Sequence, residues 1–181
     1  MNDDLVRLAQ AADFAARKHA SQRRKGERAE PYVNHLMEVA ALLAQATHGN
    51  DVVLVMGGLL HDTLEDTETS YGELVQHFGE ALAVLVQEVT DDKSLPKAER
   101  KRLQVETTPH KSHRAKLLKM ADKTSNLRAL AVEPPTGWTE QRLREYVVWS
   151  EDVMRSCRGL NAALEAEYEA AYREAKRRFG A

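Results

Sequence analysis

Residues 52–67, VVLVMGGLLHDTLEDT, run from a uniformly apolar segment into a cluster of ionisable side chains. The first eleven residues predict a buried central helix that ends in His61 and Asp62, because a helix that is apolar on every side belongs inside a protein. Glu65 and Asp66 follow three residues later. Like charges this close repel and raise one another's pKa. The pattern therefore indicates either a well-solvated helix end or a bound cation.

The rest of the chain carries the same helical periodicity, with apolar residues three and four positions apart. Ser70 and Glu73 match a capping box, Gly79 ends the helix after them, and Pro96 opens a charged helix. The predicted helices cover residues 3–20, 36–47, 52–62, 70–78, 80–90, 96–106 and 115–130, and two long helices close the chain. No segment shows the strict alternation of apolar and polar residues that predicts a strand, and no linker is long enough to divide domains. The sequence therefore predicts an all-α bundle that forms one domain over residues 1–181.

Composition and charge narrow the classes of function. The chain has 181 residues, of which 43% are hydrophobic and 30% charged, and its formal net charge is −2. This balance is typical of a globular protein and gives no overall attraction to nucleic acids or anionic membranes. The N-terminus lacks the apolar stretch of a signal peptide, and a single cysteine, Cys157, indicates a packing residue rather than a disulfide. We expect a soluble, cytoplasmic protein without nucleic-acid or membrane partners. A stripe of leucine and aromatic residues in the last helix fits either the core or a subunit contact, so a homo-oligomer is compatible with the sequence.

A metal bound beside His61 and Asp62 needs further ligands from other parts of the chain. His35 lies at the start of the second predicted helix, and Asp122 interrupts an apolar face after LLKMA. Two imidazoles and two carboxylates suit Mn²⁺, Fe²⁺, Co²⁺ or Zn²⁺ better than a soft metal. Each residue also has an ordinary interpretation, as a histidine at a helix C-terminus, a partly buried histidine, or an aspartate paired with a neighbouring cation. The other histidines lie in polar or loop-like contexts and are left out of the predicted site: His19, His48, His77, His110 and His113.

Four motifs extend the pattern along the chain: RRKGERAEPYVNH (23–35), LLHDTLEDT (59–67), FGEALAVLVQEVTDDKSLPKAERKRLQ (78–104) and KLLKMADKTSNLRAL (116–130). In order and spacing they resemble the hydrolase domain of the RelA/SpoT alarmone enzymes, which are HD-domain metal-dependent phosphohydrolases. The resemblance runs from about residue 5 to residue 160, and looks closest to the free-standing small alarmone hydrolases, such as the metazoan SpoT homolog. It implies an HD-domain helical bundle with a metal site between helices, and a hydrolase without synthetase or regulatory domains.

The resemblance also implies roles for individual residues. The ligands of a single Mn²⁺ ion would be His35, His61, Asp62 and Asp122. Glu65 and Asp66 would act on the attacking water and the scissile phosphate. The nucleotide would be contacted by Arg24, Lys25, Tyr32 and Asn126. A polyanion also needs a positive rim, for which the candidates are Lys97, Arg100, Lys101, Arg102 and Arg142, with Tyr146 beside them, although such a charge run is often a solvated helix face.

The substrate implied by the resemblance is ppGpp, the stringent-response alarmone, a guanosine with diphosphates on its 5′ and 3′ oxygens. Hydrolysis would release pyrophosphate and leave GDP, or GTP from pppGpp. A second hypothesis keeps the site but changes the substrate to another nucleotide phosphate ester, such as the 2′-phosphate of NADPH. A third, a non-catalytic alarmone-binding module, would predict a lost motif residue, and none is lost. Two departures stand out: Leu36 replaces the usual proline after His35, and a longer loop between Lys25 and Pro31 bears on substrate preference.

Overall fold

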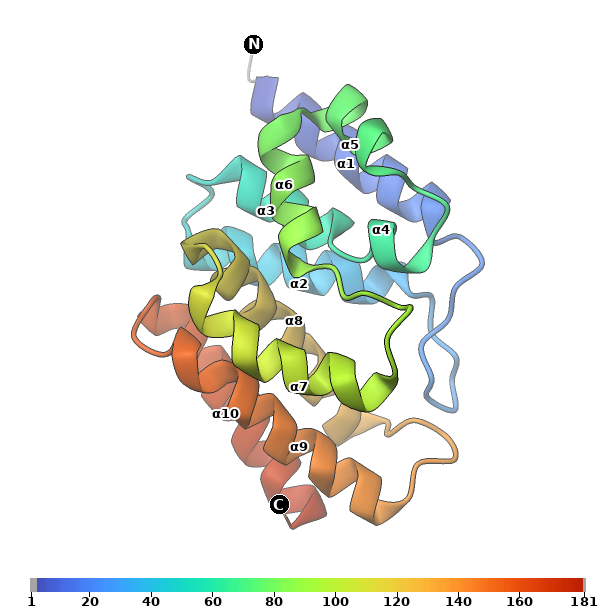
Figure 1. The fold of residues 1–181 in the computed structure, drawn as a ribbon, viewed down its shortest axis with the longest axis vertical. Coiled ribbons are helices and arrows are strands. Elements are labelled where there is room, and N and C mark those ends of the chain that lie inside the picture. Colours follow the sequence, from blue (N-terminus) through green and yellow to red (C-terminus); the bar gives the residue numbers. More distant parts are fainter. Residues whose placement is uncertain (1–2, 181) are drawn as a thin grey trace.

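The structure, a computed structural model that describes residues 3–180, contains ten α-helices and no strand in that range (Figure 1). The helices are α1 (Asp3–Lys18), α2 (Val33–Ala46), α3 (Val52–Leu60), α4 (Thr63–Asp66), α5 (Tyr71–Phe78), α6 (Glu80–Val89), α7 (Lys97–Thr107), α8 (His113–Val132), α9 (Glu140–Met154) and α10 (Ala162–Phe179). Short 3₁₀ turns follow α7 and α9, over Thr108–His110 and Arg155–Cys157. The prediction of an all-α fold is confirmed. None of the described helices combines the length and apolar content that a membrane span requires.

Two buried helices form the centre of the bundle. Seven of the nine residues of α3 are buried, as predicted for the apolar segment. The longer α8 packs against α2, α3, α6, α9 and α10. In Figure 1, α1, α3, α5 and α6 lie toward one end of the molecule and α7, α9 and α10 toward the other, with α2 and α8 between them. The residues that interrupt the apolar surfaces of α3 and α8 therefore meet inside the molecule.

Side-chain caps set the starts of α3 and α5, and the cap of α5 at Ser70 is the one that the sequence analysis predicts. The Leu54 N–H donates to Asp51 Oδ1 at 3.1 Å and begins α3. The Glu73 N–H donates to Ser70 Oγ at 3.1 Å and begins α5. The Glu73 carboxylate also lies 2.8 Å from Lys18 Nζ, so the start of α5 is paired with the end of α1.

The central helix ends earlier than the sequence predicts. It stops at Leu60, and His61 and Asp62 form a turn that leads into α4, a short helix that the sequence did not predict. The cause is local: His61 Nδ1 donates to the Gly58 carbonyl at 2.9 Å, and Thr63 Oγ1 donates to the Leu60 carbonyl at 2.6 Å. These side chains take carbonyls that a continuous helix would use. The turn points His61 and Asp62 away from the helix axis and toward α2 and α8.

The helices α2 and α3 approach closely at Gly58. A Cβ atom at Gly58 would lie 2.9 Å from the Ala40 Cα, a backbone atom that cannot yield without displacing α2. We expect Gly58→Ala to lower the free energy of unfolding by about 1–3 kcal/mol, measured by urea denaturation. Gly72→Ala in α5 is the control, because its Cβ would meet only Ser70 Oγ, at 3.9 Å, and alanine favours the helix. Equal stability of the two variants would contradict the close approach.

Candidate metal centre and active site

Three parts of the bundle bring the four predicted metal ligands together. His35 lies on α2, Asp122 on α8, and His61 and Asp62 form the turn between α3 and α4. His61 Nε2 lies 3.0 Å from Asp62 Oδ2 and 3.8 Å from Asp122 Oδ1. His35 Nε2 lies 3.3 Å from Asp122 Oδ1 and 3.9 Å from Asp62 Oδ2. Donor atoms of His35, His61 and Asp62 all lie within 4.8 Å of one another, and Asp122 reaches both imidazoles. Such separations suit donors around one ion, since these ligands bind at about 2.0–2.2 Å.

Each imidazole directs a buried nitrogen into this cluster that no protein group satisfies. His35 and His61 are only 3% and 6% exposed, and the Nε2 atom of each has no hydrogen-bond partner. The Nδ1 atoms are held by Ser125 Oγ at 2.8 Å and by the Gly58 carbonyl at 2.9 Å. A buried polar atom without a partner is costly. One divalent cation would satisfy both nitrogens and both carboxylates, so the residues present fit a metal.

The electrostatics of the cluster also call for positive charge. Burial disfavours a charged imidazole, but the carboxylates of Asp62 and Asp122 and the hydrogen bond to the Gly58 carbonyl together outweigh it and raise the pKa of His61 to about 9. Burial lowers the pKa of His35. Without a metal, a proton on His61 therefore balances part of the negative charge of Asp62 and Asp122. A metal ion and this proton compete for the same site.

Neighbouring side chains orient the two carboxylates of the cluster. Tyr32 Oη donates to Asp62 Oδ2 at 2.6 Å, and Asn126 Nδ2 donates to Asp122 Oδ1 at 2.6 Å. Lys123 Nζ lies 3.0 Å from Asp122 Oδ2. Bonds of this kind fix which carboxylate oxygen faces a metal and are a recurrent part of metal sites. Tyr32 therefore contacts Asp62 directly, and Asn126 contacts Asp122.

Ser125 sets the protonation of one ligand. Its Oγ donates to Glu38 Oε2 at 2.6 Å and therefore accepts from His35 Nδ1 at 2.8 Å, which leaves Nε2 of His35 unprotonated. We expect Ser125→Ala to weaken metal affinity by about 10–100-fold, measured by calorimetric titration of the metal-free protein. Ser150→Ala is the control, because Ser150 is equally buried but hydrogen-bonds to no ligand. An unchanged affinity in Ser125→Ala would show that Ser125 does not orient His35.

The acidic residues of α4 face two different cavities. Glu65 lines a small cavity of about 50 Å³. The lining residues of this small cavity are His61, Asp62, Glu65, Val89, Gln104, Leu118, Lys119, Asp122 and Lys123. Asp66 lines a large cavity of about 820 Å³ instead. The two carboxylates predicted to share the proton chemistry therefore line different cavities.

The surroundings of Glu65 and Asp66 also differ in charge. Glu65 Oε2 accepts the Asp91 N–H at 3.3 Å, and its Oε1 lies 3.6 Å from Arg100. Burial, and then the negative charge of Asp62, raise the pKa of Glu65 above that of an ordinary glutamate. Asp66 forms an ion pair with Lys93. A raised carboxyl pKa suits proton exchange near neutral pH.

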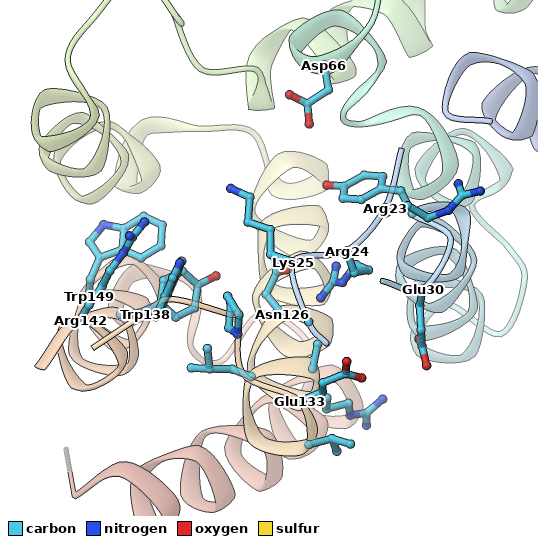
Figure 2. Close-up of a pocket in the computed structure, with 18 of the residues that line it drawn as sticks. Arg23, Arg24, Lys25, Glu30, Asp66, Asn126, Glu133, Trp138, Arg142 and Trp149 are labelled. Carbon is cyan, nitrogen blue, oxygen red and sulfur yellow. The ribbon is translucent and has the colours of Figure 1, made fainter. Parts of the chain in front are cut away.

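The large cavity brings together the residues predicted to contact the nucleotide. These residues are Arg24, Lys25, Tyr32, Asn126, Arg142 and Tyr146, and all of them line it. Figure 2 shows Arg24 and Lys25 on the loop between α1 and α2, facing Asn126 of α8, while Trp138, Arg142 and Trp149 form another side and Asp66 lies at one end. The loop is tied down, because the Thr136 N–H donates to the Lys25 carbonyl at 2.9 Å.

One wall of the large cavity combines aromatic rings with cations. Arg142 Cζ lies 4.2 Å from the ring centre of Trp138, and Lys97 Nζ lies 5.4 Å from the same ring. Lys101 Nζ lies 4.7 Å from the ring centre of Trp149. Flat rings can stack on a base, and the cations can bind phosphate. Sequence reasoning missed both tryptophans; the Pro- and Gly-rich break that ends in Trp138 was the available signal.

The structure divides the basic run of α7. Lys97, Arg100 and Lys101 line the large cavity and supply its positive rim. Arg102 does not, because it pairs with two glutamates of its own helix on the exposed side. The expectation of a rim residue is therefore wrong for Arg102, where the solvated-face interpretation applies.

His19 departs from the expected polar context. It is 1% exposed, and its ring stacks on Tyr32 with centres 5.5 Å apart. It follows the buried Ala11 and Ala15 at a spacing of four residues, which explains its burial. Through Tyr32 it packs next to Asp62.

The sequence analysis also missed Lys119 and Lys123, although polar residues at 119, 122, 123 and 126 share one face of an otherwise apolar helix.

Comparison with known proteins identifies the family. A family model described as HD domain matches residues 11–149, which is more than half of the chain. The chain belongs to the HD-domain family. All four predicted metal ligands and both acidic residues of α4 fall within the matched part of this HD domain.

Curated relatives resemble the HD-domain chain over nearly its whole length. The guanosine-3′,5′-bis(diphosphate) 3′-pyrophosphohydrolase MESH1 of Homo sapiens is 50% identical over 91% of this chain and 92% of its own. The MESH1 protein of Drosophila melanogaster is 45% identical over 93% of this chain and 94% of its own. A solved structure of a metazoan ortholog of SpoT that hydrolyses ppGpp superposes with a TM-score of 0.88 at 46% identity, covering 92% of this chain and 94% of that one. These similarities confirm the resemblance to the RelA/SpoT-type alarmone hydrolases.

Proposed function

We propose that this HD-domain protein is an Mn²⁺-dependent guanosine-3′,5′-bis(diphosphate) 3′-pyrophosphohydrolase. The observation that carries the proposal is the pair of buried, unpartnered Nε2 atoms of His35 and His61, which face Asp62 and Asp122. The names of relatives that match over nearly the whole chain support ppGpp as substrate. Two nitrogen and two oxygen donors suit Mn²⁺, since this ion accepts both kinds of ligand.

The large cavity supports a nucleotide substrate. Arg24, Lys25 and Arg142 bring positive charge to it, as a bis-diphosphate requires, and Trp138 and Trp149 offer ring surfaces for the base. Its volume of about 820 Å³ lies within the roughly 300–1,000 Å³ that is usual for ligand pockets. We propose that the nucleoside and the 5′-diphosphate bind here, with the 3′-diphosphate directed to the metal cluster.

The chemistry is the addition of water to the inner 3′-phosphate. A divalent cation at the four ligands would polarise a phosphate oxygen and lower the pKa of a water molecule. The water oxygen joins the phosphorus, the bond from phosphorus to the ribose 3′-oxygen breaks, and the ribose oxygen gains a proton. Glu65 and Asp66 are the groups that accept and return these protons. The products are pyrophosphate and GDP, or GTP from pppGpp.

We further propose that residues 1–181 form one domain, because α10, beyond the matched family region, packs along α8, which carries Asp122. We place the protein in the cytoplasm, where a nucleotide substrate would be available. A homo-oligomer stays a prediction of the sequence.

The proposal is tested by comparing two substrates on the Mn²⁺-loaded protein. We expect release of pyrophosphate from ppGpp, measured by a coupled pyrophosphate assay, and much slower release of orthophosphate from NADPH. Orthophosphate release from NADPH with ppGpp left intact would replace the proposal by the NADPH 2′-phosphatase hypothesis. Parallel metal analysis relates each activity to the amount of bound Mn²⁺.

A further inference from the structure

The small cavity lies against the metal cluster and contains charge that the proposed chemistry does not use. Tyr32 and Asn126, which line the large cavity, hydrogen-bond to Asp62 and Asp122, which line the small one. The ligand carboxylates therefore stand between the two cavities. Gln104 of α7 lines both, so the two spaces are neighbours at this point as well.

Lys119 brings an uncompensated cation to the small cavity. It is only 5% exposed, and no carboxylate among residues 3–180 lies within ion-pairing distance of its Nζ; the carboxylates of Asp91 and Asp122 act on it only at longer range. Burial lowers the pKa of Lys119 to about 8, so its ammonium group is mostly charged at neutral pH. Lys123, one turn later and equally buried, is paired with Asp122 at 3.0 Å. A buried, unpaired ammonium group is costly unless an anion joins it.

The acidic residues of the small cavity have other partners. Asp62 and Asp122 face the two imidazoles of the metal cluster. Glu65 lies 3.6 Å from Arg100 and accepts a backbone N–H. None of these groups neutralises Lys119. An anion that enters the cavity would lie near the ammonium group of Lys119 on α8 and near a metal ion bound at the cluster.

The size of the small cavity limits what this anion can be. At roughly 10–15 Å³ for one water molecule, a volume of about 50 Å³ holds roughly three to five water-sized atoms. The four oxygens of a single phosphate group fall within that range. A nucleoside needs far more space and fits only the large cavity.

We infer that the small cavity binds the outer phosphate of the substrate's 3′-diphosphate through Lys119. The inference rests on the proposed function and adds a residue that binds the outer phosphate of the substrate at the same site. The inner phosphate carries the ribose ester and stays at the metal cluster, with its nucleoside in the large cavity. The outer phosphate extends away from the ribose and reaches Lys119. Hydrolysis breaks the bond to the ribose oxygen and leaves the bond between the two phosphates intact, so pyrophosphate remains held at both ends until release.

Binding of the inorganic products tests this inference without requiring turnover. Inorganic pyrophosphate and orthophosphate are titrated calorimetrically into Mn²⁺-loaded wild-type protein and Lys119→Met. We expect Lys119→Met to weaken pyrophosphate binding by about 10–100-fold and orthophosphate binding by less than about threefold, because only the outer phosphate loses its charged partner. Methionine has a similar length and needs no partner, so the variant should fold. Lys119→Gln, which removes the charge but keeps a polar group on a shorter side chain, should behave in the same way.

The matched control is Lys116→Met, one turn earlier on α8, because Lys116 is half-buried and lines neither cavity. It should bind both anions as the wild type does. Wild-type pyrophosphate affinity in Lys119→Met, or equal losses for the two anions, would overturn the inference. Failure of the wild type to hydrolyse ppGpp would instead contradict the proposed function, and the binding data would still decide the role of Lys119.

Discussion

Asp62→Ala is expected to remove bound metal and turnover together. Asp62 Oδ2 lies 3.0 Å from His61 Nε2 and 3.9 Å from His35 Nε2, and Tyr32 orients the same oxygen. Alanine removes a predicted ligand at the centre of the cluster and leaves only the Asp122 carboxylate beside the two imidazoles to balance a cation. Since charge stabilisation by a metal contributes several kcal/mol to such reactions, we expect the rate to fall by about 10³-fold or more.

The measurement combines metal content by mass spectrometry with pyrophosphate release from ppGpp. Asp13→Ala is the control, because Asp13 lies on the exposed side of α1 and pairs only with Arg17. This control should keep both metal and activity. Retention of either property in Asp62→Ala would mean that Asp62 is not a ligand of the active metal.

Glu65→Gln is expected to abolish turnover while the metal stays bound. Glu65 lines the small cavity beside the ligands but belongs to α4 and contributes no atom to the donor cluster. Glutamine keeps the shape of the side chain and an oxygen that can accept the Asp91 N–H, but it loses the negative charge beside Arg100 and cannot accept or release a proton. A positioned proton-transfer group is worth about 10²–10⁴-fold in rate, and we expect a loss of that size. Glu68→Gln, on the exposed segment after α4, is the control and should behave as the wild type.

The pH profile separates the two roles open to Glu65. Its pKa is raised by burial and by Asp62. If Glu65 accepts the proton of water, it must be ionised, so activity falls as pH drops through this raised pKa. If Glu65 donates a proton to the ribose oxygen, it must be protonated, so activity falls as pH rises through the same value. Wild-type turnover by Glu65→Gln would remove it from the chemistry altogether.

The cluster of His35, His61, Asp62 and Asp122 was accessible from the sequence because its members belong to recognisable motifs. His61 and Asp62 follow a buried apolar segment, and Asp122 interrupts another, so the chemistry of each residue contrasts with its surroundings. The break between α3 and α4 was not predicted, because it depends on side chains that compete for the Gly58 and Leu60 carbonyls. Helical periodicity is insensitive to such local competition.

The cavity walls were harder to predict than the metal cluster. Trp149 and Lys101 are separated along the chain and meet only because α7 packs against α9. Periodicity does show that Arg102 and Lys101 point in different directions, but not which of them faces a cavity. The unpaired state of Lys119 is likewise a property of the packed bundle, because it depends on which carboxylates of other helices come near.

Stepwise return of Mn²⁺ to chelator-treated protein tests most directly whether the four-ligand cluster is the catalytic centre. Pyrophosphate release from ppGpp is followed as the ion is added to the metal-free protein. We predict no activity at the start, a linear rise, and a sharp plateau at about one Mn²⁺ per chain, because the cluster offers donors for a single ion. Full activity in the metal-free protein, or no activity at any Mn²⁺ concentration, would contradict the assignment of His35, His61, Asp62 and Asp122 as the metal site of a hydrolase.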